Sequence, residues 1–464
     1  MTQADHTAPV EETTPDHSPS SALPPLRLGV AGLGTVGAGL LALLERCEGN
    51  LSRHCGRDVV VQAVSARSRG RDRGVSLEGV TWHDDPVALA RDPEVDIVVE
   101  LIGGSDGPAR AVVENALRLG KPVVTANKAL IARHGHELAA LSQQYQAPVL
   151  YEAAVGGALP AVRLVRDTCS ADEVLCVGGI LNGTCNYILT EMANTGRSFA
   201  DVLDEAQAKG YAEADPSTDI DGVDTAHKLA ILAGLAFQPL DFTSIPVTGI
   251  RHVTTEDLRF AATLGYRVRL LGMARRGLGA STPPEAWVQP CLVPEDSALA
   301  TVNGVYNAVT AEAHFAGPLV ITGQGAGAGP TASAVASDIA ALARNWPSRT
   351  HAFPLWGVHS QPASGRDVLG EGKAAGAENV TSRFYMRCEV DDRPGVMADV
   401  ASILRDHGVS VHQVIQHEAA LPNHVHMALV THPANAEAVA QAAQRMAMLP
   451  CIHETPMVMK VEPS

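Results

Sequence analysis

One stretch of the chain, residues 210–233, combines residue types at a spacing that could do chemistry: GYAEADPSTDIDGVDTAHKLAILA. Five acids lie within twelve residues, and a single lysine, Lys228, follows them before an apolar run begins. Carboxylates can hold the ammonium group of a small substrate, and a lysine among them is a general acid whose pKa its neighbours tune. The stretch therefore predicts a site that binds an amine and protonates an alkoxide. Its acids are Glu213, Asp215, Asp219, Asp221 and Asp224.

The element that must position these groups is a helix, which the pattern predicts over residues 219–236. Asp221, Asp224 and Lys228 are three and four residues apart, so they would share one helix face. An exposed acidic loop followed by a helix with an ordinary ion pair is the alternative interpretation. The residues of the opposite, apolar face would be Ala226, Leu229, Ala230 and Ala233.

Near the N-terminus, an apolar strand at 26–31 runs into the sequence GLGTVG and then into an apolar helix that reaches about Leu44. A strand, G-x-G-x-x-G and a helix in this order are typical of dinucleotide binding. The first glycine makes the turn, the second admits the pyrophosphate, and the third lets the helix pack on the strand. The helix N-terminus adds amide donors for the phosphates. The predicted cofactor contacts are Gly32, Gly34, Thr35, Val36 and Gly37.

Strands and helices alternate after this turn, which predicts a parallel, doubly wound α/β sheet. Ligands of such sheets bind at the carboxyl ends of the strands. Thr125, Asn127 and Lys128 follow one of these strands, so we expect them beside the nicotinamide. The expected strands cover 59–65, 96–101 and 122–125, and the expected helices 108–119 and 128–145.

The sequence after the second strand bears on the choice of cofactor. The run SARSRGR at 65–71 contains no acid to hold the ribose hydroxyls, whereas guanidinium groups suit a 2′-phosphate. NADP is therefore the preferred cofactor, NAD the alternative one, and Arg67 the first candidate to bind the phosphate. The competing interpretation is that these arginines face water in a long loop.

Two stretches rich in small residues could also bind ligands. In YEAAVGGALP at 151–160, exposed backbone carbonyls could ligate a hard cation together with Glu152, although a simple tight turn is the stronger alternative. The second stretch, GQGAGAGPT at 323–331, precedes a helix at 332–344. Its backbone could approach a phosphate or the nicotinamide ribose, and a flexible linker is the alternative.

Length, charge and composition exclude several classes of protein. A chain of 464 residues suggests two or three domains. A net charge of -16 argues against a nucleic-acid partner, which needs a basic face. No apolar run reaches the roughly 20 residues needed to cross a bilayer, so no membrane partner is expected. The first 25 residues lack the basic start and apolar centre of a signal peptide and are expected to be a disordered tail.

The cysteines and histidines give weaker signals. Eight scattered cysteines without a CxxC pair indicate reduced thiols and a cytoplasmic protein. The H-x-H pairs His134/His136 and His424/His426 have no third ligand nearby in the sequence, so they are interpreted as surface histidines rather than a transition-metal site.

The last part of the chain predicts a separate domain. Residues 346–380 are rich in Pro, Gly and Ser and are typical of a linker. From Thr381 onward, strands and helices are expected in the order β-α-β-β-α-β over about 80 residues, which is the ferredoxin-like arrangement.

The combined pattern resembles homoserine dehydrogenase with a C-terminal ACT regulatory domain, from Leu26 to nearly the end of the chain. RPGV (393–396) resembles the first turn of ACT domains. The motifs that carry the rest of the resemblance are GLGTVG (32–37), TANK (125–128), YEAAVGGALP (151–160), GILNGTCNYIL (179–189), the acidic stretch at 210–233, and the glycine-rich turn at 323–329.

The resemblance implies an NAD(P)-dependent reaction that joins L-aspartate 4-semialdehyde and L-homoserine, on the route to threonine and methionine. By matching position, Lys228 would be the proton donor or acceptor, assisted by Lys128. Gly210 and Gly325 would line the nicotinamide or a cation. The substrate-binding residues would be Glu213, Asp219, Asp224, Thr184 and Tyr211. A monovalent cation, usually sodium, would be held by Glu152 and the backbone carbonyls of Val155, Gly157 and Leu159.

The resemblance also implies a homodimer or homotetramer and an ACT domain that binds an amino-acid effector, with threonine the expected one. The rival functions are another Rossmann dehydrogenase of an amino-acid-like substrate and a non-catalytic amino-acid sensor. The expected fold class is α/β, with an α+β domain for substrate and dimerisation. The expected parts are a tail (1–25), a Rossmann-type domain (26–151), the catalytic domain (152–330), a helix returning to the nucleotide domain (331–345), a linker (346–380) and the ACT domain (381–464).

Overall fold

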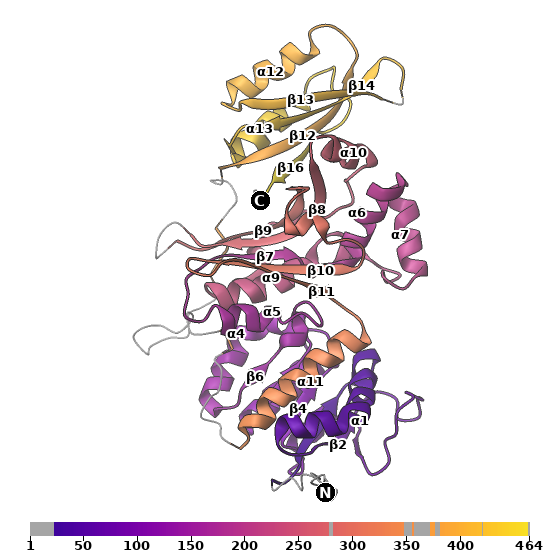
Figure 1. Ribbon diagram of the computed structural model, residues 1–464, viewed down its shortest axis with the longest axis vertical. Helices are drawn as coiled ribbons and strands as arrows, with labels where there is room; N and C mark the ends of the chain where they lie inside the picture. Colours follow the sequence, from indigo (N-terminus) through magenta and orange to yellow (C-terminus); the bar gives the residue numbers. More distant parts are fainter. Residues whose placement is uncertain are drawn as a thin grey trace, which may run out of the picture.

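The computed structural model describes residues 23–277, 282–347, 355–356, 372–375, 381–419 and 421–462. They form three units that follow one another along the longest axis of the molecule (Figure 1). Most of the expected N-terminal tail and most of the expected linker lie outside the described residues. Among the helices described, none is long and apolar enough to cross a membrane.

The first unit is a six-stranded parallel sheet with the strand order β3-β2-β1-β4-β5-β6. This order confirms the predicted doubly wound sheet, and the point where the order reverses lies between β1 and β4. The edge strand β3 and the helix α2 (Pro86–Arg91) were not predicted, because elements of three and six residues are too short to show a clear periodicity. The strands are β1 (Leu26–Ala31), β2 (Val59–Ser65), β3 (Thr81–His83), β4 (Ile97–Glu100), β5 (Val123–Thr125) and β6 (Val149–Leu150).

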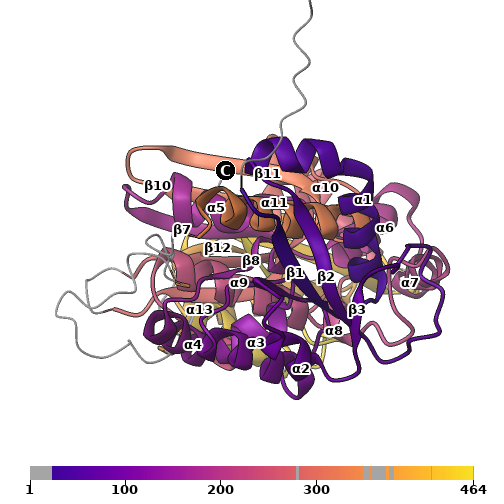
Figure 2. The same ribbon diagram turned by 90° about the horizontal axis from the view of Figure 1, so that it is seen from below.

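Helices cover both faces of this sheet (Figure 2). Successive strand side chains point to opposite faces, so Ile97 and Val99 join the apolar cluster under α1 and α11, while Val98 joins the cluster under the other three helices. The helix α11 comes from far along the chain and packs against α1. The helices are α1 (Thr35–Cys55) and α11 (Ala328–Asn345) on one face, and α2, α3 (Pro108–Arg118) and α4 (Lys128–Tyr145) on the other.

The second unit is an antiparallel sheet in the order β11-β10-β7-β8-β9. The buried helix α9 (Val223–Ala236) packs on β7, β8 and β9, and α4 of the first unit packs against it. The strands are β7 (Val174–Ile180), β8 (Tyr266–Arg275), β9 (Glu285–Pro294), β10 (Tyr306–Ala313) and β11 (Gly317–Gln324). The other helices are α5 (Ala161–Arg163), α6 (Gly183–Thr195), α7 (Phe199–Ala208), α8 (Ser217–Ile220) and α10 (Thr255–Thr263).

The third unit has the predicted ferredoxin-like order, with two helices packed on one face of a sheet ordered β16-β12-β14-β13. Its sheet is continuous with that of the second unit, because β16 pairs in parallel with β9 through Lys460 and Val461. Its elements are β12 (Thr381–Asp391), α12 (Val396–Asp406), β13 (Val411–Glu418), β14 (His424–Thr431), β15 (Ala434–Asn435), α13 (Ala436–Met446) and β16 (Met457–Val461).

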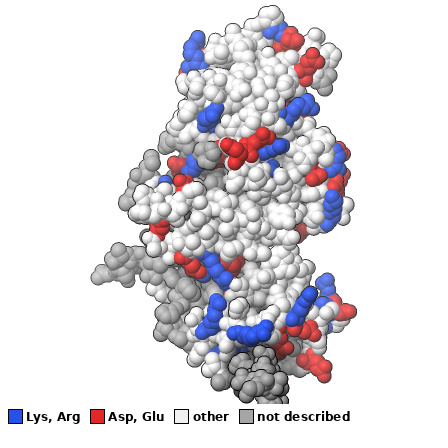
Figure 3. All heavy atoms as spheres, viewed as in Figure 1, with Lys and Arg blue, Asp and Glu red and all other residues white. Residues whose placement is uncertain are grey.

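Charged side chains of both signs are scattered over the face shown in Figure 3, and most of its described surface is uncharged. Blue and red groups frequently adjoin one another there, and the described part of this face has no continuous basic surface.

Candidate active site

The acidic stretch forms two helices rather than the single predicted helix. The short helix α8 ends at Ile220, and Gly222 then takes a left-handed conformation (φ 85°) before α9 begins at Val223. Asp221 therefore lies outside α9, where it accepts a hydrogen bond of 3.0 Å from Nη2 of Arg251 at the surface. The prediction that Asp221 shares a face with Asp224 and Lys228 is wrong, because the break at Gly222 turns it away.

Asp224 joins the two candidate catalytic lysines. It lies in the first turn of α9, and its Oδ2 accepts a hydrogen bond of 2.7 Å from Nζ of Lys228, one turn further along. Its Oδ1 lies 2.9 Å from Nζ of Lys128, the first residue of α4. The Lys228 side chain is 10% exposed and that of Lys128 is 40% exposed. The site therefore opens to solvent on the side of Lys128.

The charges of this cluster support one another. Burial alone would raise the pKa of Asp224, but the ammonium groups of Lys228 and Lys128 outweigh it and hold that pKa well below its usual range. In return, the charge of Asp224 raises the pKa of Lys128 above its ordinary value. Asp224 is thus a carboxylate and Lys128 an ammonium group at neutral pH.

Asn182 links the lysine cluster to the rest of the acidic stretch. Its Nδ2 donates hydrogen bonds to Oδ1 of Asp219 (2.8 Å) and Oδ2 of Asp224 (2.9 Å). Its Oδ1 caps α6 by accepting from the amide of Cys185 at 2.8 Å. Burial raises the pKa of Asp219, and the nearby charge of Asp224 adds to this shift. Asn182 was not among the predicted site residues, although an asparagine that opens a helix is a recognisable capping signal.

A second asparagine that sequence analysis missed is Asn307 on β10. Its Nδ2 donates to the carbonyl of Leu181 at 2.9 Å, and the same carbonyl accepts from Nζ of Lys228 at 2.7 Å. A Cβ added at Gly325 would lie 2.1 Å from Cγ of Asn307. Gly325 is therefore needed so that Asn307 can support the position of Lys228. Nothing in the sequence around Asn307 marks it.

The remaining predicted substrate residues form the outer part of the site. The hydroxyl of Thr184 donates to the carbonyl of Tyr211 at 2.8 Å and lies 3.4 Å from Oδ2 of Asp219. The side chains of Tyr211 and Glu213 are exposed, and within the described part of the chain Glu213 has no hydrogen-bonded side-chain partner. Gly210 takes a left-handed conformation (φ 73°), and a Cβ there would meet open space.

The glycine-rich turn between β1 and α1 has the geometry that its sequence predicts. A Cβ at Gly32 would lie 2.4 Å from the backbone of Leu101, and a Cβ at Gly37 would lie 2.0 Å from the carbonyl oxygen of Gly32. At Gly34, by contrast, a Cβ would meet nothing within 4 Å. The first and third glycines are thus required by packing, while the second leaves room for a phosphate. These residues fit a dinucleotide.

The arginine loop after β2 lies against this turn. Arg73 donates to the carbonyl of Leu33 at 3.2 Å, and the guanidinium groups of Arg69 and Arg73 lie 5.9 and 5.6 Å from the ring centroid of Trp82. Arg67 is exposed and has no interaction partner among the described residues. Arg67 was predicted from the sequence, whereas Arg73, which connects the loop to the turn, was not.

Thr125 is held by a buried carboxylate rather than left free. Its hydroxyl donates to Oε2 of Glu100 at 2.6 Å and accepts from the amide of Asn127 at 3.0 Å. Oε1 of Glu100 accepts from the amides of Ile102 and Gly103. Glu100, which sequence analysis did not single out, therefore joins the loops after β4 and β5. These loops lie at the carboxyl ends of the strands, where Lys128 begins α4.

The predicted cation loop after β6 is buried from Glu152 to Gly157. Within the described residues the carbonyls of Val155 and Gly157 accept no hydrogen bond, whereas that of Leu159 accepts from Ala161 at 2.8 Å. Buried carbonyls without a partner are costly, and a hard cation would satisfy them. The loop touches the second glycine-rich turn, because the amide of Ala158 donates to the carbonyl of Gln324 at 3.2 Å.

The carboxylate of Glu152 already has other partners. It accepts hydrogen bonds from the amides of Val162 (2.8 Å) and Arg163 (3.2 Å) at the start of α5. Asp338 on α11 accepts from the amide of Glu152 and pairs with Arg163 at 2.9 Å. Burial, with the charge of Asp338, raises the pKa of Glu152 to about 7, and burial raises that of Asp338 to about 6. Added positive charge would favour the ionised form of both.

Comparisons with known proteins agree with this geometry. The model of the homoserine dehydrogenase family matches residues 160–340, the model of the homoserine dehydrogenase NAD-binding domain matches 32–152, and the ACT domain model matches 384–447. The homoserine dehydrogenase of Pseudomonas aeruginosa is 42% identical over 411 residues, which are 88% of this chain and 92% of that protein.

Solved structures give the same result. The crystal structure of a homoserine dehydrogenase from Thiobacillus denitrificans matches with a TM-score of 0.86 and 39% identity, covering 94% of this chain and 98% of that one. A hyperthermophilic archaeal homoserine dehydrogenase in complex with NADPH matches with a TM-score of 0.59 and 27% identity, over 70% of this chain and 99% of that one. With its lysine pair, its glycine-rich turn and its ACT domain, this chain belongs to the homoserine dehydrogenase family.

Proposed function

We propose that the protein interconverts L-aspartate 4-semialdehyde and L-homoserine, and that the ammonium groups of Lys228 and Lys128 act on the reacting oxygen. The single observation that carries this proposal is that Asp224 pairs with Nζ of both lysines, 2.7 and 2.9 Å from its two oxygens. This buried carboxylate holds the two ammonium groups close together, and Lys128 begins α4 shortly after the end of β5.

The chemistry at this oxygen follows from the donors that remain. The nicotinamide, when bound, supplies or takes up the hydride. Nζ of Lys228 has three N–H groups, of which two donate to Leu181 and Asp224, so that one remains for the substrate oxygen. That donor stabilises the developing alkoxide and delivers the proton. Lys128, whose pKa is raised, stays charged and adds electrostatic stabilisation.

The substrate ammonium would be held at the outer side of the site. Glu213 is the best candidate, because its exposed carboxylate has no hydrogen-bonded side-chain partner among the described residues. Thr184, Tyr211 and Asp219 line the same side. Asp224, which positions the two lysines, would also contact the substrate. Thr125 and Gly210 would contact the nicotinamide through their backbones, since the Thr125 hydroxyl is engaged by Glu100.

NADP is the cofactor that the arginine loop favours. Arg67 lies two residues beyond β2, is exposed and is free to pair with a 2′-phosphate. Arg73 ties the same loop to the phosphate turn, which would hold Thr35, Val36 and the α1 amides toward the pyrophosphate. The NADPH complex of the archaeal relative supports the same choice.

The test is homoserine oxidation with NAD and NADP side by side, followed by the absorbance of the reduced nicotinamide. Turnover with NADP and a higher KM for NADP, but not for NAD, in Arg67→Ala would support the proposal. Turnover with NAD alone would overturn the cofactor choice and keep the activity. If neither cofactor supported turnover, the proposed reaction itself would be refuted.

A monovalent cation, sodium in the first instance, is proposed for the loop after β6. Glu152 and the carbonyls of Val155, Gly157 and Leu159 would hold it. Two of these carbonyls lack other partners in the described chain, and the loop packs on Gly325 beside the active site. The cation would thus fix the position of both glycine-rich segments.

We assign the C-terminal domain the binding of an amino-acid effector, with threonine the first candidate. The domain is well connected to the catalytic unit, since its sheet continues that of β9 and Asp257 of α10 accepts from Tyr385 and Arg387 of β12. An effect of binding at the ACT domain could reach α10 by this route and, through α6, Asn182.

The proposed division of the described chain is a nucleotide-binding domain (26–151), a catalytic domain (152–330), a helix that returns to the nucleotide domain (331–345) and the ACT domain (381–464).

We further propose that the protein forms a homodimer or homotetramer and that it is located in the cytoplasm. The edge strand β11 and the adjoining turn expose apolar side chains, among them Phe315 and Val320, which a second copy of the chain could cover. All eight cysteines are unpaired, as expected for a reducing compartment. Light scattering on the purified chain would decide the oligomeric state.

A further inference from the structure

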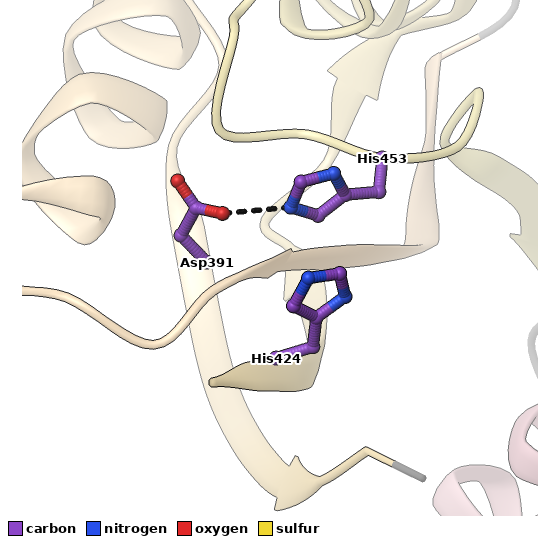
Figure 4. A group of neighbouring side chains, drawn as sticks. All are labelled: Asp391, His424 and His453. Carbon is purple, nitrogen blue, oxygen red and sulfur yellow. Dashed lines mark hydrogen bonds and ion pairs between the residues drawn. The ribbon is translucent and has the colours of Figure 1, made fainter. Parts of the chain in front are cut away.

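Three side chains of the ACT domain meet far from the active site. Asp391 ends β12, His424 begins β14, and His453 lies in the segment between α13 and β16 (Figure 4). One ligand atom from each residue lies within 4.8 Å of the other two. No third ligand could be assigned to His424 from the sequence, because Asp391 and His453 lie 33 and 29 residues from it along the chain.

The first histidine is oriented as a metal ligand would be. Nδ1 of His424 lies 2.6 Å from Oε1 of Glu389, so the carboxylate fixes the ring and favours the tautomer with a lone pair on Nε2. A carboxylate behind the distal nitrogen is the usual support of a metal-bound imidazole. Glu389 lies two residues before Asp391 on the same strand, so both carboxylates come from β12.

The second histidine is held against the first. The rings of His424 and His453 are parallel, with centroids 4.1 Å apart and an angle of 5° between the planes, so the more exposed ring of His453 must turn before both Nε2 lone pairs can face one ion. Nε2 of His453 lies 2.7 Å from Oδ1 of Asp391. Backbone hydrogen bonds fix the segment, since the amide of His453 donates to Glu389 and that of Asp391 donates to Cys451, both at 3.0 Å.

We propose that Asp391, His424 and His453 bind a first-row divalent transition metal such as Zn²⁺. The two imidazoles and one carboxylate match the donors that such ions take, and water would fill the remaining positions of a partly open site. The metal would take the place of the proton between Nε2 of His453 and Oδ1 of Asp391: from an imidazolium ring this proton would leave to solvent, and in a neutral ring it would pass to Nδ1 by tautomer exchange.

The location gives the site a structural consequence. Oδ2 of Asp391 accepts from Nε of Arg393 at 3.3 Å, and Arg393 belongs to the RPG turn that leads into α12. A bound ion would therefore join that turn, the start of β14 and the segment before β16. It would stabilise the ACT domain without touching the lysine cluster.

The experiment is calorimetric titration of the full chain, stripped with a chelator, with ZnCl₂. We expect His424→Gln, His453→Gln and Asp391→Asn each to bind one zinc fewer per chain than the wild type. Glu389→Gln, which only loses the support of His424, should weaken that zinc by about 10–100-fold. The matched control is the double variant His412→Gln/His432→Gln, at an exposed pair of histidines whose rings meet edge to face and which have no carboxylate partner among the described residues.

Two further measurements keep the test decisive. Circular dichroism melting of the metal-free variants checks that they fold. Co²⁺ in place of Zn²⁺ should give a spectrum of nitrogen and oxygen ligands without a thiolate band, which distinguishes the site from any cysteine. Absence of zinc binding by the wild-type chain, or an equal number of zinc ions in the wild type and the three ligand variants, would overturn the proposal.

Discussion

Two buried carboxylates, Asp224 and Asp257, each pair with cationic side chains, but only the cluster around Asp224 reaches solvent. Asp224 pairs with Lys128 and Lys228, and the Lys128 side chain is 40% exposed. Asp257 accepts from Tyr385 at 3.0 Å and from Arg387 at 2.7 Å, and neither Asp257 nor Arg387 is more than 5% exposed.

The difference lies in what each cluster leaves unused. Oδ2 of Asp257 accepts from both the amide and the hydroxyl of Thr254 in a capping box, so the carboxylate is saturated and closed off. At Asp224, by contrast, each lysine keeps at least one N–H donor for a further group, and the cluster opens to solvent beside Lys128. A buried ion pair therefore does not by itself indicate a catalytic site. The indication of a catalytic site comes instead from unpaired N–H donors that face an opening.

The largest expected effect is on stability at the closed cluster. Arg387→Leu leaves the buried Asp257 without its cation, and such a loss costs about 3–5 kcal/mol. Urea unfolding followed by circular dichroism should show the ACT transition at a markedly lower midpoint. Arg405→Leu, at a well-exposed arginine of the same domain, is the matched control and should change that midpoint little. Equal effects of the two changes would contradict the structural role of Asp257.

At the open cluster the expected effect is on rate. Asp224→Asn removes the charge that positions both lysines, so kcat should fall by about a hundredfold. Because Asp224 is the main cause of the raised pKa of Lys128, the alkaline limb of the kcat–pH profile should move to lower pH. Asp221→Asn is the control, from the same acidic stretch but paired with Arg251. It should retain normal kcat, and a similar loss there would refute the distinction.

A third buried carboxylate, Glu152, should respond to pH in the opposite sense from Asp224. Its folded pKa of about 7 exceeds the unfolded value of about 4.3, so the folded state binds the extra proton between these values. This contribution to stability is fully present below about pH 4 and is lost as pH rises through 7, by at most about 1.4 kcal/mol per pH unit.

Thermal melting across this pH range checks the prediction. Glu152→Gln should flatten the profile of melting temperature against pH, and sodium chloride should raise the wild-type melting temperature near pH 8 more than choline chloride does. If the two salts acted equally, the cation proposal would fail even with the predicted pH dependence intact.

The smallest expected effect on stability is that of Tyr385→Phe, and this variant also tests whether the closed cluster transmits the effector signal to the catalytic unit. Tyr385→Phe removes one hydrogen bond to Asp257 and should cost about 1 kcal/mol. If threonine acts through β12 and α10, this variant should need more threonine for half inhibition at unchanged kcat without threonine. Tyr306→Phe, at an exposed tyrosine of β10, is the control. Unchanged threonine sensitivity in Tyr385→Phe would argue against this route.

Local patterns account for the parts of the fold that the sequence predicted correctly. The strands at 26–31 and 59–65, the helix at 128–145 and the glycine-rich turn all depend on neighbours in sequence, and the structure confirms them. The break at Gly222 was missed because apolar periodicity continues across it. The pairing of β16 with β9 joins segments with no local signal for one another.

The candidate site shows the same limit, since local patterns reveal only those of its residues that are marked by type and spacing. Asp219, Asp224 and Lys228 were singled out from residue type and spacing, and Lys128 from its place after a strand and from the family resemblance; the structure brings the four together. Asn307 could not be found, because its importance comes from the carbonyl that it shares with Lys228. The roles of Asp257, Glu100 and the His424 cluster likewise arise only from contacts between distant segments.

The most direct test of the central claim compares kcat for homoserine oxidation in Lys228→Ala and Lys209→Ala. Lys209 pairs with Glu205 at the surface of the same unit and serves as the matched control. Proton transfer by Lys228 predicts a loss of roughly a hundredfold or more in kcat for Lys228→Ala, with normal turnover for Lys209→Ala. Near-normal turnover of a folded Lys228→Ala protein would contradict the account.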